Sequence, residues 1–221
     1  MQKSPTKNQL DKLLQHYQTK NFKKAEELGI IITNNFPEDE LAWKILSVSL
    51  KKLGKISDSL IAIQKIIKIN PKNHLAYYNL GNTYKELGKI YEAKKSFKKA
   101  VSLNPSFLEA HYNLAIVSKE NGNLEEAIIS YEKIIYINPN FVTAYNNLGN
   151  IFNDLGELDK AEKNYKKVIS LNPKFAEAYN NLGNIYEKKG KIDKAKIKYE
   201  EAISINPKLT NAHRQLSLVK N

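Results

Sequence analysis

The chain contains no cysteine among its 221 residues. Disulfides, thiolate metal ligands and cysteine nucleophiles are therefore excluded. Arginine occurs once, at Arg214. No apolar run approaches the roughly 20 residues of a membrane-spanning helix, and the polar start of the chain lacks the apolar core of a signal peptide. We therefore expect a cytoplasmic protein with no membrane partner.

Proline and glycine, which both interrupt helices, recur at a fixed interval. Six of the seven prolines are 34 residues apart, and five of the nine glycines share that spacing. They are Pro37, Pro71, Pro105, Pro139, Pro173 and Pro207, and Gly54, Gly88, Gly122, Gly156 and Gly190. This period is too short for a domain and too long for a coiled-coil repeat, so each period should be one supersecondary unit.

The unit at 142–175 shows the content of one period. Residues 143–155 carry apolar side chains at helical spacing, and Gly156 then breaks the pattern. A second helical pattern covers 159–171 and stops at Pro173. Each unit is thus predicted to be a helix A, a short turn and a helix B, and neighbouring units must stack to bury their apolar faces.

Small residues recur at one position of each helix. They are Ser47, Gly81, Ala115, Gly149, Gly183 and Ser217 in helix A, and Ala25, Ser59, Ala93, Ala127, Ala161 and Ala195 in helix B. A glycine inside a helix costs about 1 kcal/mol relative to alanine. The recurrence therefore predicts that helices A and B approach each other closely at these positions.

The combined pattern resembles the tetratricopeptide repeat. Three units carry it most completely: Tyr77, Leu80, Gly81, Tyr84, Ala93, Phe97, Ala100 and Pro105; Tyr145, Leu148, Gly149, Phe152, Ala161, Tyr165, Val168 and Pro173; and Tyr179, Leu182, Gly183, Tyr186, Ala195, Tyr199, Ala202 and Pro207. The resemblance implies an all-α fold, a right-handed α-solenoid of helix-turn-helix repeats. It implies an N-terminal tail at 1–5, six units at 6–39, 40–73, 74–107, 108–141, 142–175 and 176–209, and a C-terminal capping helix at 210–221.

The resemblance also places the second, fifth, sixth, ninth, twelfth and thirteenth slots of each unit on a concave groove. The predicted peptide-binding residues at these slots are Asn79, Asn113, Asn147 and Asn181 at the sixth, Asn82, Asn150 and Asn184 at the ninth, and Tyr78, Tyr112, Asn146 and Asn180 at the fifth. The carbonyl and NH2 of an asparagine amide match the two polar groups of a peptide backbone. The row resembles the asparagine ladder in the tetratricopeptide region of O-linked N-acetylglucosamine transferase. We expect it to hold an extended peptide, with a hydrophobic residue of that peptide near the tyrosines, which we expect to be exposed.

A compositional explanation of the asparagines stays open. The chain is rich in Asn, Lys and Ile, a bias that would enrich asparagine at any tolerant exposed site.

Charge leaves a further partner to consider. Lys and Arg total 35 against 23 Asp and Glu, a net charge of +12. Most of the excess lysine lies in helix B and is expected to decorate the convex face. A single arginine argues against specific nucleic-acid binding, because arginine usually makes the bidentate contacts. Weak nonspecific binding of nucleic acid remains the third functional hypothesis.

No catalytic or metal-binding motif is present. Eight of the nine glycines belong to the repeat pattern, and the four histidines lack metal-ligand spacing. We predict no catalytic residue, no metal and no cofactor. The leading hypothesis is a scaffold that binds a protein or peptide, and its oligomeric state is not predicted. The alternative is the substrate-recruiting N-terminal region of a larger sulfotransferase or glycosyltransferase, because such arrays often precede transferase domains.

Overall fold

The computed structural model describes residues 4–220, and every regular element in that range is an α-helix. The predicted tail at 1–5 and cap at 210–221 therefore lie partly outside the described residues. The helices are α1 (Lys7–Gln18), α2 (Phe22–Asn35), α3 (Glu40–Lys52), α4 (Ile56–Ile69), α5 (His74–Glu86), α6 (Ile90–Leu103), α7 (Leu108–Glu120), α8 (Leu124–Ile137), α9 (Val142–Asp154), α10 (Leu158–Leu171), α11 (Ala176–Lys188), α12 (Ile192–Ile205) and α13 (Thr210–Lys220). This order confirms the predicted all-α repeat fold.

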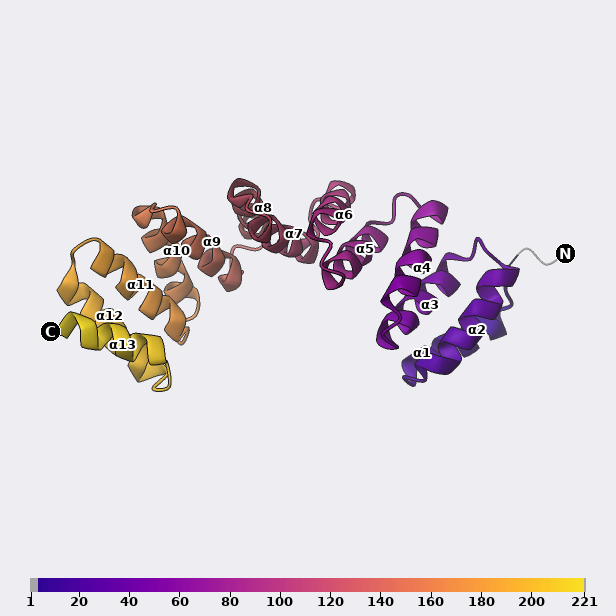
Figure 1. Ribbon diagram of the computed structural model, residues 1–221, viewed down its shortest axis with the longest axis horizontal. Coiled ribbons are helices and arrows are strands. Elements are labelled where there is room, and N and C mark those ends of the chain that lie inside the picture. The colour runs from indigo at the N-terminus through magenta and orange to yellow at the C-terminus, as the bar shows by residue number, and fades with distance from the viewer. Residues whose placement is uncertain (1–3, 221) are drawn as a thin grey trace. The chain divides into compact units, whose positions relative to one another are not determined.

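The chain divides into two compact units, the first ending at Asn121 and the second beginning at Gly122. The first holds α1 to α7 and the second α8 to α13. Within each unit, every helix packs against the next one along the chain (Figure 1). Odd-numbered helices are the A helices of the repeats and even-numbered helices are the B helices.

Helix boundaries follow local chemistry. Asp39 and Asn73 cap the N-termini of α3 and α5, and their side chains accept hydrogen bonds from backbone N–H groups three residues later. Each of the five glycines at the A–B turn has a positive φ, between 69° and 76°. Such angles suit glycine because it has no Cβ. Lys20, at the same turn of the first repeat, also has a positive φ of 59°.

The recurring glycines of helix A lie against an aromatic ring of helix B. A Cβ added at Gly149 would lie 2.6 Å from the Tyr165 ring, and one added at Gly183 would lie 2.5 Å from the Tyr199 ring. The predicted close approach is confirmed, but the surface that meets the glycine is the aromatic ring four residues after the small residue of helix B.

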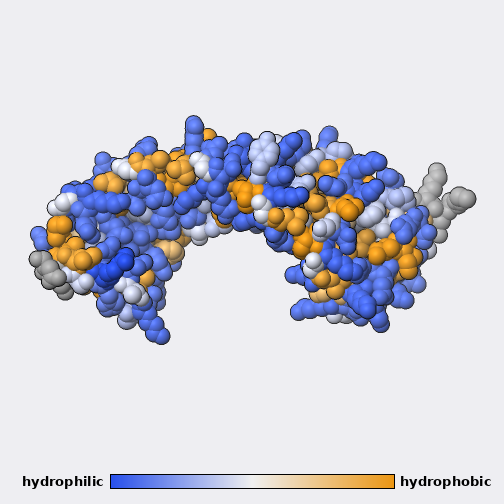
Figure 2. All heavy atoms as spheres, in the orientation of Figure 1, coloured by the Kyte–Doolittle hydropathy of each residue, from blue (hydrophilic) through white to orange (hydrophobic). Residues whose placement is uncertain are grey.

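These ring and alanine positions belong to the buried core of each unit, together with buried leucine, isoleucine and valine side chains. Phe97 in the first unit and Tyr165 and Tyr199 in the second are almost completely buried, as are Ala93, Ala161 and Ala195. Figure 2 shows hydrophilic side chains over most of the visible face of each unit, with smaller hydrophobic patches between them. Among the described residues, no helix has the length and apolarity required to span a lipid bilayer.

Candidate peptide-binding surface

Asparagines of neighbouring A helices are hydrogen-bonded to one another in the first unit. The Nδ2 of Asn113, in α7, donates to the Oδ1 of Asn82 and to the hydroxyl of Tyr78, both in α5, at 3.2 Å each. All three side chains are half-buried. The sixth slot of one repeat therefore pairs with the ninth slot of the repeat before it.

The same pairing occurs in the second unit and extends to helix B. The Nδ2 of Asn181 donates to the Oδ1 of Asn150 at 3.3 Å, and that oxygen also accepts from the hydroxyl of Tyr165 at 2.7 Å. The hydroxyl of Tyr199 donates to Asn184 in the same way, at 2.8 Å.

Asn147 has a different partner. The ninth slot of the repeat before it holds Ile116, which has no acceptor in its side chain. The Nδ2 of Asn147 donates to the hydroxyl of Tyr131, in α8, at 3.0 Å. Each sixth-slot asparagine from Asn113 onward thus uses its NH2 group inside the protein.

The asparagine rows therefore have a structural role, because their side chains join helices to one another. This structural role could have been predicted from the intervals between the residues in the sequence. The sixth slot follows the ninth slot of the previous repeat by 31 residues, and Tyr165 follows Asn150 by 15. A tyrosine hydroxyl and two amides at these intervals predict a hydrogen-bonded cluster once the repeats are known to stack.

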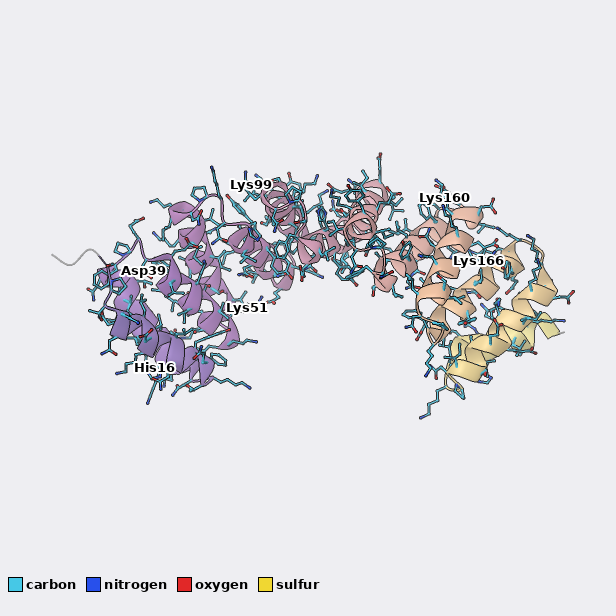
Figure 3. The ribbon with its side chains drawn as sticks, turned by 180° about the vertical axis from the view of Figure 1, so that it is seen from behind. His16, Asp39, Lys51, Lys99, Lys160 and Lys166 are labelled. Carbon is cyan, nitrogen blue, oxygen red and sulfur yellow. The ribbon has the colours of Figure 1, made fainter. Side chains whose placement is uncertain are left out.

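Asn79 is the exception among the four sixth-slot asparagines. It is exposed, and its side chain makes no hydrogen bond with any other described residue. It lines a cavity of about 410 Å³ together with Val48, Lys51, Thr83 and Glu86. The Nζ of Lys51 and a carboxylate oxygen of Glu86 lie 2.8 Å apart across α3 and α5, and Lys51 is labelled in Figure 3.

The two fifth-slot asparagines of the second unit each hold an unsatisfied acceptor. The Oδ1 atoms of Asn146 and Asn180 are buried and accept no hydrogen bond from the described residues. Asn180 is only 7% exposed. A buried acceptor without a donor costs about 1–3 kcal/mol, and here the cost recurs at the same slot of two successive repeats.

The tyrosines expected to be exposed in the groove are half-buried, so that expectation was wrong. The ring of Tyr78 packs against the rings of Phe97 and Phe107, with centroids 5.9 and 4.9 Å away. Aromatic packing of this kind holds the side chain in the core. At the second slot of the repeats, Leu41 and Leu75 are exposed, and Leu75 is 47% exposed.

Electrostatics reinforce the structural role of the buried tyrosines. Burial raises the pKa of the Tyr165 and Tyr199 hydroxyls above the ordinary value, and hydrogen bonding to Glu187 adds to the increase at Tyr199. Both hydroxyls therefore remain protonated donors at neutral pH. Within the described residues, no group of three His, Asp or Glu side chains is placed to hold a metal ion.

Family models match the second half of the chain and part of the first. Models described as tetratricopeptide repeats match residues 74–107, 108–141, 130–163 and 176–209, and one described as a TPR repeat matches residues 149–190. A search of curated proteins found no match.

Solved structures show the same fold. The crystal structure of MamA protein is 30% identical with a TM-score of 0.72, and the match covers 78% of this chain and 94% of that one. YrrB, described as a TPR protein with an unusual peptide-binding site, is 24% identical with a TM-score of 0.75, covering 86% of this chain and 98% of that one. A tetratricopeptide repeat protein from Parabacteroides merdae is 19% identical with a TM-score of 0.69, covering 97% and 98%.

Proposed function

Because the chain belongs to the tetratricopeptide repeat family, we propose that it is a protein-binding scaffold whose A helices hold extended peptide segments of a partner. Arrays of stacked repeats present long binding surfaces of this kind. The peptide-binding site described for YrrB lies on the same fold. The proposal assigns the chain no catalytic step.

The observation that carries the proposal is the pair of unsatisfied carbonyl oxygens at Asn146 and Asn180. Both lie at the fifth slot of an A helix, one repeat apart. A bound peptide in extended conformation offers backbone N–H groups at regular intervals, and each such donor satisfies one of these acceptors. Both oxygens are buried in the free chain, so the proposal requires the two side chains to move when the peptide binds.

In the first unit, the proposal rests on Asn79 and the cavity that it lines. The exposed amide presents both a donor and an acceptor to a peptide backbone. Exposed Leu41 and Leu75, and not the packed ring of Tyr78, supply the apolar contact for a partner side chain. A hydrophobic anchor on the partner therefore lies near the leucines in this proposal.

We expect the other asparagines of the rows to contact the peptide through side-chain groups that form no hydrogen bond within the described part of the protein. Asn113 and Asn147 retain their carbonyl oxygens, and Asn82, Asn150 and Asn184 retain their NH2 groups. The Oδ1 of Asn181 accepts a hydrogen bond from the Nδ2 of Asn180 at 3.5 Å, so a peptide N–H would share this acceptor. The likeness of these rows to the ladder of O-linked N-acetylglucosamine transferase, and a peptide contact by Tyr112, stay predictions.

The test begins with a displayed library of random peptides, from which the whole chain selects a binder. The affinity of the binder is then measured by calorimetry against the chain and against the Asn146→Ala, Asn180→Ala double variant. Two lost hydrogen bonds of about 0.5–1.5 kcal/mol each predict binding weakened by a factor between about 5 and about 150. N-methylation of the peptide backbone at the contacting positions should give a similar loss.

The control is Asn140→Ala, because Asn140 is exposed in the turn between α8 and α9 and lies on no A helix. This variant should bind the peptide with unchanged affinity. Failure to select any peptide, or equal binding by the double variant and the parent chain, would contradict the proposal.

A further inference from the structure

Two cavities of matching composition lie between helix A and helix B, one in each unit. The cavity of the first unit has a volume of about 710 Å³ and lies between α5 and α6. The cavity of the second unit has a volume of about 730 Å³ and is formed mainly by α9 and α10. Every residue that lines the first has its counterpart, two repeats later, in the lining of the second. We call them the basic pockets.

The floor of each basic pocket is apolar and aromatic. It consists of Tyr77, Leu80 and Tyr84 in the first unit and of Tyr145, Leu148 and Phe152 in the second. Leu80 and Leu148 are buried, and Tyr77 and Tyr145 are half-buried. A floor of this size and polarity suits a large apolar side chain.

The rim of each basic pocket is cationic. Three lysines are common to both, Lys95, Lys98 and Lys99 in the first unit and Lys163, Lys166 and Lys167 in the second. One acidic residue lines each pocket, Glu92 or Glu132. Figure 3 labels Lys99 on α6, and Lys160 and Lys166 on α10.

In each pocket, two of the rim lysines lie where their like charges destabilise the helix. Lys95 and Lys99 are four residues apart, as are Lys163 and Lys167, so each pair of like charges shares one helix face. All four side chains are exposed and form no ion pair in the part of the chain that the structure describes. Lys166 differs, because its Nζ lies 2.6 Å from Glu162. An anionic ligand would attract both lysines of a pair and so offset the repulsion between them.

The corresponding cavity in the last repeat has no basic rim. There a cavity of about 490 Å³ is lined by Tyr179, Ile197, Glu200 and Glu201. Isoleucine occupies the position of Lys163, and glutamates occupy those of Lys166 and Lys167. The basic rim is therefore a property of particular repeats and does not follow from the fold alone.

We propose that each basic pocket binds a short acidic segment of a partner protein, with one hydrophobic side chain on the aromatic floor and carboxylates on the rim lysines. This surface is separate from the asparagine rows of the A helices. The apolar floor favours such a segment over nucleic acid, because a phosphate backbone would use only the rim. Lysine, a point charge on a flexible stem, suits carboxylates in varied positions.

The probe for the test is a short fluorescein-labelled peptide with Phe and Leu at its centre and Asp and Glu on both sides. Its binding to the whole chain is followed by fluorescence anisotropy. The variant changes all four unpaired lysines, by Lys95→Glu, Lys99→Glu, Lys163→Glu and Lys167→Glu. We expect binding at least about tenfold weaker in this variant, since each reversed rim charge removes an attraction and adds a repulsion. Binding by the parent chain should also weaken as NaCl is raised.

The matched control applies the same charge change elsewhere on exposed helix surfaces, by Lys7→Glu, Lys12→Glu, Lys23→Glu and Lys24→Glu. It should lose less than about threefold in affinity, because distant charges are screened. Circular dichroism of both variants should show unchanged helix content. A probe with Ser in place of Phe and Leu should bind more weakly, which separates the pocket from simple charge attraction.

Equal losses in the pocket variant and the control would overturn the proposal, because binding would then depend on net charge alone. Equal binding of the two probes would also overturn it, because the floor would be unused. A third outcome would also overturn the proposal: a single-stranded oligonucleotide that binds more tightly than the peptide, displaces it, and depends on the same four lysines. The proposal is supported if affinity falls only in the pocket variant, and if the parent chain binds the probe without Phe and Leu more weakly.

Discussion

At the scale of single residues, the helix A glycines are constrained by the aromatic rings that face them. The 2.6 Å between an added Cβ at Gly149 and the Tyr165 ring is shorter than any normal contact of a Cβ atom. Tyr165 is almost fully buried and its hydroxyl is hydrogen-bonded to Asn150, so the ring has little freedom to move. A side chain at this position must displace the ring or separate the two helices.

Gly149→Leu should therefore destabilise the second unit. Overpacking of a well-packed core typically costs about 1–3 kcal/mol, and leucine at a closed position should reach the upper part of that range. Thermal unfolding followed by circular dichroism checks the prediction. Thr143→Leu, at an exposed position of the same helix, is the control and should change the melting temperature little. An unchanged unfolding curve for Gly149→Leu would refute the assignment of Gly149 to the helix contact.

At the scale of helices, the asparagines join neighbouring repeats. Asn113 in α7 donates to Asn82 and Tyr78 in α5, and all three are half-buried. Removing this donor leaves an acceptor on Asn82 without a partner, which costs more than the hydrogen bond itself. Asn79 occupies the same slot one repeat earlier but is exposed and unpaired.

These two asparagines form a matched pair for mutation. Asn113→Ala should lower the free energy of unfolding by about 1–2 kcal/mol, whereas Asn79→Ala should change it by less than about 0.5 kcal/mol. Chemical denaturation of both variants measures the difference. Similar effects of the two substitutions would mean that the hydrogen bonds across repeats contribute nothing to stability.

The same helices show what could be predicted from the sequence. The positions of Gly156 and Pro173 predicted the turn and the end of helix B, because backbone restrictions at glycine and proline are local. The structure begins α9 at Val142 and α10 at Leu158, each one residue before the expected start. The bonds of Asn150 to Tyr165 and Asn181 were not predicted, since they depend on how far one repeat is displaced against the next. The burial of Tyr78 was missed for the same reason, because Phe107 covers it from outside its own helix pair.

At the scale of the whole molecule, stability is a sum over repeats and the contacts between neighbours. One such contact in the second unit is ionic. The Nζ of Lys189, in the turn after α11, lies 2.5 Å from carboxylate oxygens of both Glu162 and Asp159 in α10. Glu162 is 17% exposed and also pairs with Lys166, whereas Asp159 is 97% exposed. Glu162 should therefore contribute most of the ionic interaction between the two repeats.

This contact makes the stability of the second unit depend on pH. Burial opposes ionisation of Glu162, but the hydrogen bonds and charges of Lys166 and Lys189 outweigh it and lower its pKa from 4.5 to about 2. A carboxyl group with a lowered pKa in the folded state stabilises the fold above its unfolded pKa. That stabilisation declines as the pH falls from about 4.5 to about 2.

Glu162→Gln should accordingly lower the stability at neutral pH by about 1 kcal/mol, the upper value for partly exposed ion pairs. It should also make the loss of stability on acidification shallower, so that the curves of the variant and the parent chain converge near pH 2. Thermal unfolding across this pH range measures both effects. Asp159→Asn, which removes the exposed partner of the same lysine, should leave the acid dependence almost unchanged. If instead Asp159→Asn flattened the acid dependence and Glu162→Gln did not, the exposed carboxylate would be the one that couples the two repeats.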